Sequence, residues 1–351
     1  MEPLSASQAV LPAIERTRQF LFEPFRWGSY LKLATIACLS EGIFETIHYS
    51  RNDRTAINAA SLSEIQWTPE VTAWTLFAVI SGLGLSFLFY YVILRLRFVL
   101  FHCLVHRTRE IRGAWELYGR QSMRLFLANL LVWVGILLLC LVMVGGLALT
   151  AFSVLTLKTP SDKFDPGVFF ILFLPCLGFA FFVAFLAIAA EVTLHDFVLP
   201  HMAIENASFR AAWKAARRAI AAEKETFFSY FILRLLLPLV AFLVLLMVAA
   251  IPLLFIGWIL WTSSTGFHDM LDDAIGVMAV LRVFLAVVFG LIGAVFAVGT
   301  AMGLGGPLAT WMRSYAILFY AGRYKALGEL LEGAAAAEAD RVEGTASAGP
   351  A

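Results

Sequence analysis

Three ionisable residues, Glu41, Glu45 and His48, lie four and three positions apart within a largely apolar stretch of this 351-residue sequence. Residues at these spacings share one face of a helix, so the three side chains would lie together. Ionisable groups inside a bilayer are costly, and they commonly mark proton or cation sites. These residues are therefore the candidate intramembrane polar site. The alternative is that Glu45 and His48 are hydrated at the outer membrane edge, while Glu41 pairs with a neighbouring polar group.

A second group of ionisable residues follows a later apolar stretch and comprises Glu191, His195, Asp196 and His201. Carboxylate and imidazole groups four positions apart, as in Glu191 and His195, could ligate a metal. Glu45-x-x-His48 matches half of the di-metal motif of helical bundles, but such a site needs a second Glu-x-x-His motif on another helix, which the sequence lacks. We therefore predict no metal or cofactor here, and expect these residues to be satisfied by water and lipid headgroups.

Sequence motifs of catalysis are missing. The chain has no glycine-rich phosphate loop with lysine, no His-Glu-x-x-His, no Gly-x-Ser-x-Gly and no Cys-x-x-Cys. Its four cysteines lie far apart in or beside apolar stretches, which favours buried thiols over a disulfide framework. We predict that the protein is not an enzyme.

Composition indicates the environment of the chain. Hydrophobic residues make up 61% and charged residues 15%, whereas a soluble domain is about half apolar and one-quarter charged. A water-soluble fold of this composition would expose very large apolar patches. The first 27 residues lack the features of a cleaved signal peptide. The sequence therefore predicts an all-α, polytopic membrane protein.

Six spans are expected. Five stretches are long enough to cross about 30 Å of hydrocarbon, and they lie at 73–94, 125–157, 168–190, 227–261 and 283–305. The sixth, at 28–48, contains two acids that cost about 5 kcal/mol to insert, so it needs neighbouring helices. With six spans, most of the 26 Lys and Arg residues fall in alternate segments. The positive-inside rule then places both termini in the cytoplasm.

Two cytoplasmic loops repeat one another. Phe98–Val105 aligns without gaps to Phe197–Ile204, and Ile111–Trp115 matches Phe209–Trp213. Such repeats occur in transporters, but duplication also builds other helical bundles. A basic amphipathic helix follows each block and suits the anionic inner leaflet. The candidate lipid contacts on these helices are Arg107, Arg109, Arg112, Arg210, Lys214, Arg217 and Arg218.

The C-terminal part divides at a glycine- and proline-rich sequence. A transmembrane helix should break at Gly303–Pro307, and 308–328 should form another interfacial helix. The tail after 328 is rich in Ala, Gly, Glu and Ser and is predicted to be disordered. The expected organisation is a cytoplasmic segment at 1–27, a membrane domain at 28–328 and a tail at 329–351.

The repeated blocks, the opening sequence FEPFRWGSYLKL at 22–33 and the six-span spacing resemble a group of uncharacterised bacterial membrane proteins. These are similar to the membrane domain sometimes fused to glycerophosphodiester phosphodiesterases. The resemblance covers about residues 20–325 and implies a membrane architecture. A fused phosphodiesterase would need a soluble barrel of about 250 residues, for which this chain has no room. No enzyme activity is therefore carried over.

Three functions are consistent with these features. The first is a structural, accessory or lipid-interacting role in the cytoplasmic membrane, with membrane lipids, other membrane proteins or a second copy as partners. The second is a transporter or permease with a polar site near the first span, and the third is a membrane-embedded lipid enzyme. Nucleic-acid binding is not expected, because each basic run lies beside a span.

Overall fold

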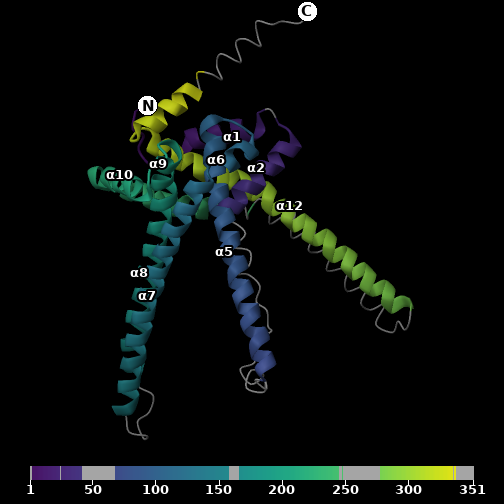
Figure 1. Ribbon diagram of the computed structural model, residues 1–351, viewed down its shortest axis with the longest axis vertical. Helices are drawn as coiled ribbons and strands as arrows, with labels where there is room; N and C mark the ends of the chain where they lie inside the picture. Colours follow the sequence, from purple (N-terminus) through teal and green to yellow (C-terminus); the bar gives the residue numbers. More distant parts are fainter. Residues whose placement is uncertain are drawn as a thin grey trace, which may run out of the picture.

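The computed structural model describes residues 2–23, 25–41, 68–157, 166–244, 247, 277–334 and 336. Every regular element in these ranges is a helix, so the predicted all-α class is confirmed for this part of the chain. The helices form a compact head, from which long helices extend as three diverging legs (Figure 1). The elements are α1 (Val10–Phe22), α2 (Trp27–Ser40), α5 (Pro69–His106), α6 (Ile111–Leu117), α7 (Gly119–Leu157), α8 (Pro166–Val192), the π-helix η1 (Thr193–Val198), α9 (Leu199–Ile204), α10 (Phe209–Ala222) and α12 (Val277–Ala321).

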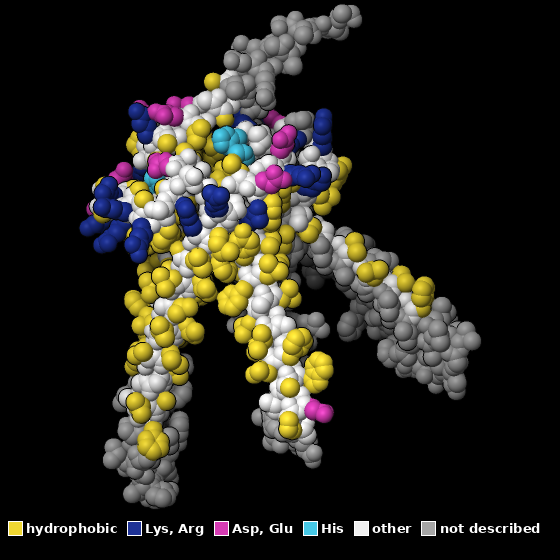
Figure 2. Space-filling view, in the orientation of Figure 1, with side chains coloured by type: hydrophobic (Ala, Val, Ile, Leu, Met, Phe, Trp, Pro, Cys, Tyr) yellow, Lys and Arg dark blue, Asp and Glu magenta, His cyan; other side chains and the backbone are white. Residues whose placement is uncertain are grey.

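The legs carry the apolar surface of the molecule. Where the legs are described, hydrophobic side chains gather on them, whereas Lys and Arg side chains gather on the head (Figure 2). Four helices in the described ranges are long and apolar enough to cross a membrane, and they are Pro69–His106, Gly119–Thr150, Leu174–Ile204 and Lys224–Val244. Their large apolar side chains are mostly exposed outside the head, as hydrocarbon surroundings allow. The described part of the chain therefore has four candidate membrane spans, which is compatible with a membrane protein.

Two further predicted spans stay predictions. The stretch at 283–305 lies within α12. The first part of 28–48 forms α2, which packs in the head against α5 and α12, and residues 42–48 lie outside the described part of the chain. The predicted tail is helical up to residue 334, with Leu331 buried in the head, so a disordered tail beginning at 329 is wrong.

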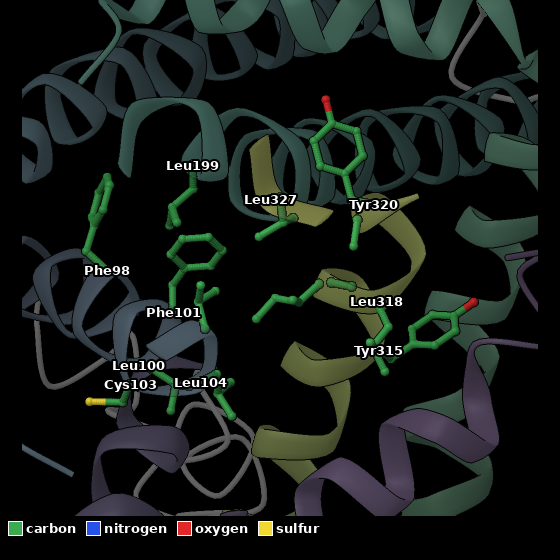
Figure 3. Packing of buried hydrophobic residues seen from close by; sticks show 14 of the residues in the cluster. Phe98, Leu100, Phe101, Cys103, Leu104, Leu199, Tyr315, Leu318, Tyr320 and Leu327 are labelled. Carbon is green, nitrogen blue, oxygen red and sulfur yellow. The ribbon is translucent and has the colours of Figure 1, made fainter. Parts of the chain in front are cut away.

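The two repeated blocks form part of the core of the head. Both are buried, and Phe101 of α5 points toward Leu199 of α9 in the core (Figure 3). Each block is followed by a residue in the left-handed conformation, Arg107 with φ 50° and Asn206 with φ 51°. Both residues stand nine positions after the first phenylalanine of their block. The sequence repeat therefore corresponds to a repeated backbone turn.

The predicted break at Gly303–Pro307 is wrong, and so is a separate interfacial helix at 308–328. α12 continues through Pro307 to Ala321, and its residues 312–321 are buried in the head. Proline has no N–H group to donate to the carbonyl four residues earlier, which belongs to Gly303. The hydroxyl of Tyr30 donates to that carbonyl at 2.7 Å. α2 thus supplies the hydrogen bond that proline removes.

Replacing this hydroxyl tests the explanation. Tyr30→Phe leaves the Gly303 carbonyl without its donor, and we expect it to lower the free energy of unfolding by about 1 kcal/mol. In a Pro307→Ala background, residue 307 regains its N–H group, so Tyr30→Phe should lower the free energy of unfolding by a smaller amount. Chemical unfolding in detergent micelles measures both values. If Tyr30→Phe lowers the free energy of unfolding equally in both backgrounds, the Tyr30 hydroxyl does not replace the hydrogen bond that Pro307 removes.

Candidate functional site

A cluster of buried and partly buried charges joins several helices of the structure. Five elements contribute to it: the C-terminal end of α2 provides Glu41, α5 provides Arg97 and η1 provides Asp196. Arg234 comes from the helix Lys224–Val244, and Arg313 comes from α12. Buried charges are tolerated only where they are paired and hydrogen-bonded. We call this set of five residues the ionic cluster.

Asp196 is the centre of the ionic cluster. Its Oδ2 accepts from the Tyr230 hydroxyl at 2.8 Å and from Arg234 Nε at 3.1 Å, and its Oδ1 accepts from Arg313 Nη1 at 3.2 Å. The side chains of Asp196 and Arg313 are both 1% exposed. One carboxylate thus joins two arginines from different helices, and it ties the helix Lys224–Val244 to α12.

The π-helix η1 sets the direction of this carboxylate. A π-helix inserts an extra residue per turn and changes the direction in which side chains point, and it is frequent at functional sites. Here it lies between α8 and α9 and buries both His195 and Asp196. Its His195 carbonyl also accepts from Arg313 at 2.9 Å. The irregular turn therefore presents both a side chain and a carbonyl to the same arginine.

Arg97 and Glu41 complete the ionic cluster. Arg97 donates to the Ser40 carbonyl and to the imidazole of His195, and its Nη2 lies 3.0 Å from Glu191 Oε1. Glu41 Oε2 accepts from Arg234 Nη2 at 3.2 Å. These contacts tie α2 to α5, η1 and the helix Lys224–Val244. Each acid of the ionic cluster is therefore within hydrogen-bonding distance of an arginine.

A cavity of about 250 Å³ adjoins the ionic cluster, lined by Glu41, Arg97, Glu191, His195 and Arg234 among others. A water molecule takes about 30 Å³, so several waters would fit. Polar walls beside membrane helices could hold a small hydrated ion or pass protons. No group of three His, Cys, Asp or Glu residues arranged for a metal occurs in the described ranges.

The structure brings part of the predicted polar site into this cluster. Glu41 belongs to it, while Glu45 and His48 lie outside the described residues. The expectation that His195, Asp196 and His201 are satisfied by water and headgroups is wrong. All three are buried and bind protein groups, with His201 Nε2 lying 2.8 Å from the Tyr320 hydroxyl. They lie inside the head and not at its lipid-facing edge.

Sequence reasoning missed the three arginines of the ionic cluster. Arg234 was recognisable as a charge within a predicted span, which is itself a signal of a buried partner. A second signal lies in the repeat, because Arg97 and Asp196 both directly precede their FVL block and carry opposite charges. Arg313 gave no comparable signal.

The seven predicted lipid contacts are divided between three places. Arg107 and Arg109 line a separate cavity in the head. Arg112 is exposed on α6, where its Nε lies 3.5 Å from Glu116 Oε1. The four basic residues of α10 are exposed on one helix, where Figure 2 shows a concentration of positive side chains. They are Arg210, Lys214, Arg217 and Arg218.

Comparison with known proteins gives a match to one family model. No curated protein and no solved structure matches the chain. Nothing found links it to the membrane domain fused to glycerophosphodiester phosphodiesterases. One family model, described as a family of unknown function (DUF7544), matches residues 4–330, which is most of the chain. The chain therefore belongs to this family of unknown function.

Proposed function

We propose that this protein has a structural or accessory role in the cytoplasmic membrane, which it crosses six times with both termini in the cytoplasm. The observation that supports this is the place of α10. That helix lies crosswise to the α7 and α8 leg, at the level where the apolar surface begins (Figures 1 and 2). Its Ala212 and Ala216 are buried against the head, while its basic residues are exposed. A helix so placed suits the anionic inner leaflet.

The ionic cluster also fits a structural role. Four of its charges pair with one another and Arg97 pairs with Glu191, so the cluster joins helices through ion pairs. The diverging legs would be covered by lipid, by other membrane proteins or by a second copy of the chain. The resemblance to the membrane domain of glycerophosphodiester phosphodiesterases is part of this proposal, and the duplicated blocks support it.

Neutralising α10 tests the lipid contact. We expect anionic phosphatidylglycerol in nanodiscs to stabilise the wild-type protein relative to phosphatidylcholine alone. Each basic residue near the surface contributes about 1 kcal/mol, so Arg217→Gln/Arg218→Gln should lose about 2 kcal/mol of that stabilisation. The measurement is the unfolding transition in each lipid at low and high salt. The matched control is Arg18→Gln/Lys325→Gln, which removes two exposed charges elsewhere on the head. Equal loss in both variants would refute the lipid contact.

A transporter is the second candidate, and the cavity beside the ionic cluster favours it. In this function, Glu41 would exchange its contact with Arg234 for a proton or a substrate. A proton-dependent flux in proteoliposomes that Glu41→Gln abolishes would support the transporter and exclude a purely accessory role.

A membrane-embedded lipid enzyme is the third candidate, and no contact in the described ranges favours it.

A further inference from the structure

The cavity beside the ionic cluster joins charged groups to helices that could span a membrane. Four members of the ionic cluster line it, and so does Glu191. Most of its other described lining residues are apolar, and five of these belong to two candidate spans. On the helix Lys224–Val244, the lining residues Phe231, Leu235 and Pro238 lie four and three positions apart and therefore share one face. The cavity is thus amphipathic.

The apolar side of the cavity is also its open side. Among the described lining residues, the exposed ones are Ile188 at 38%, Leu235 at 50% and Glu191, whose side chain is 52% exposed. Arg97 and Asp196, on the charged side, are buried. Exposed apolar side chains continue along both helices away from the head, as expected for surfaces in contact with lipid. The cavity therefore opens toward the surface that lipid would cover, with Glu191 at its edge.

The size of the cavity suits part of a lipid. Its volume of about 250 Å³ is below the range of about 300–1,000 Å³ that is usual for sites enclosing a whole drug-sized ligand. A phospholipid headgroup is smaller than such a ligand, and its acyl chains would remain outside, along the exposed apolar side chains. Pockets between transmembrane helices on the cytoplasmic side bind lipid headgroups in other membrane proteins. The volume and the position of the cavity are therefore compatible with a headgroup site.

The charges around the cavity are balanced. Ion pairs join the three arginines of the ionic cluster to its two acids and to Glu191, so positive and negative groups are equal in number. A purely anionic headgroup would be repelled by the carboxylates, and a purely cationic group would be repelled by the arginines. A zwitterionic headgroup avoids this repulsion, because each of its charges can approach a group of opposite sign.

Glu191 and Arg234 are placed to receive these two charges. Glu191 Oε1 accepts from Arg97 Nη2 at 3.0 Å, and the half-exposed carboxylate can accept further hydrogen bonds. Arg234 donates through Nε to Asp196 and through Nη2 to Glu41, and a guanidinium group has more N–H donors than these two contacts use. Because Arg234 lines the cavity, its remaining donors are available to a phosphate.

We propose that this cavity binds the headgroup of phosphatidylethanolamine, with the ammonium at Glu191 and the phosphate at Arg234. The ammonium of ethanolamine carries N–H groups that a carboxylate accepts. The trimethylammonium of phosphatidylcholine has none and is usually recognised by cages of aromatic side chains, whereas Phe231 is the one Phe, Tyr or Trp in the described lining. The proposal rests on the lipid-interacting role proposed above, but it does not involve α10, so either lipid contact can fail alone.

Competition between two lipids tests the proposal. The full chain is placed in nanodiscs with equal amounts of phosphatidylethanolamine and phosphatidylcholine, and native mass spectrometry counts the lipids that the released protein retains. We expect the wild type to retain phosphatidylethanolamine with a preference of about tenfold or more, because charge-assisted hydrogen bonds are strong. Glu191→Gln should remove most of this preference. The matched control is Glu205→Gln, which neutralises another half-exposed acid outside the cavity and should keep it.

Filling the mouth of the cavity gives a second test, which holds even if Glu191→Gln disturbs the fold. Ile188→Trp places a bulky side chain at the mouth, and we expect it to lower the retention of phosphatidylethanolamine to that of phosphatidylcholine. Leu177→Trp is the control, because Leu177 is also exposed and lies about three turns earlier on the same face of α8. It should leave the preference unchanged.

Soluble phosphoethanolamine distinguishes a lipid from a free ligand. Added to nanodiscs of phosphatidylcholine alone, it should not raise the unfolding temperature. A rise that depends on Glu191, without preferential retention of phosphatidylethanolamine, would identify a water-soluble ligand and overturn the lipid proposal. Equal retention of the two lipids by the wild type, or equal loss of preference in Glu191→Gln and Glu205→Gln, would also overturn it.

Discussion

Asp196→Asn is expected to lower the free energy of unfolding by about 3–5 kcal/mol, the cost of removing one partner from a buried ion pair. The amide keeps nearly the same shape but loses the negative charge. Arg234 retains Glu41, whereas Arg313 loses the one carboxylate within 4 Å of it among the described residues. The large effect follows because Arg313 is almost fully buried and water cannot replace the lost charge.

Chemical unfolding in detergent micelles measures this change, and Glu116→Gln is its matched control. Glu116 pairs with Arg112 on the exposed surface of α6, where ion pairs contribute about 0–1 kcal/mol. The control should therefore unfold almost like the wild type. If Asp196→Asn is no less stable than Glu116→Gln, the ionic cluster does not hold the head and the legs together.

Gly306→Ala is expected to lower the free energy of unfolding by about 1–3 kcal/mol, as is usual when an atom is forced into a packed core. A Cβ at Gly306 would lie 2.5 Å from the Cβ and 2.8 Å from the Cα of Ala34. Backbone atoms cannot rotate away, so α2 and α12 must separate. Cys38 of α2 is buried, and we expect its maleimide labelling, read by peptide mass spectrometry, to become faster.

Gly303→Ala provides the control on the same helix. A Cβ at Gly303 meets no atom within 4 Å, and alanine favours helix by about 1 kcal/mol over glycine. This variant should be as stable as the wild type or slightly more stable, with Cys38 protected. If both variants label Cys38 equally fast, close approach at Gly306 does not hold α2 in place.

Part of the fold could be predicted from the sequence because hydrophobic length is a local property. The helices that contain 73–94, 125–157 and 168–190 were expected from the number of apolar residues needed to cross hydrocarbon. The duplicated blocks were also visible, and the structure adds that each ends in the same left-handed turn. Local rules failed at Pro307, because the hydrogen bond that rescues the helix comes from Tyr30, far away in the sequence.

The sequence by itself predicted the helical class seen in the described residues, the long apolar helices that could span a membrane and the repeated unit, since composition and periodicity carry that information. Only the tertiary structure decided which charges meet. Asp196, Arg234 and Arg313 are separated by many residues, and their pairing depends on how η1, the helix Lys224–Val244 and α12 pack. The cavity lined by Arg16, Arg26 and Arg107 likewise brings together α1, the residue before α2 and the turn after α5. Electrostatic contacts act over a few ångströms in space, so separation along the chain does not reveal them.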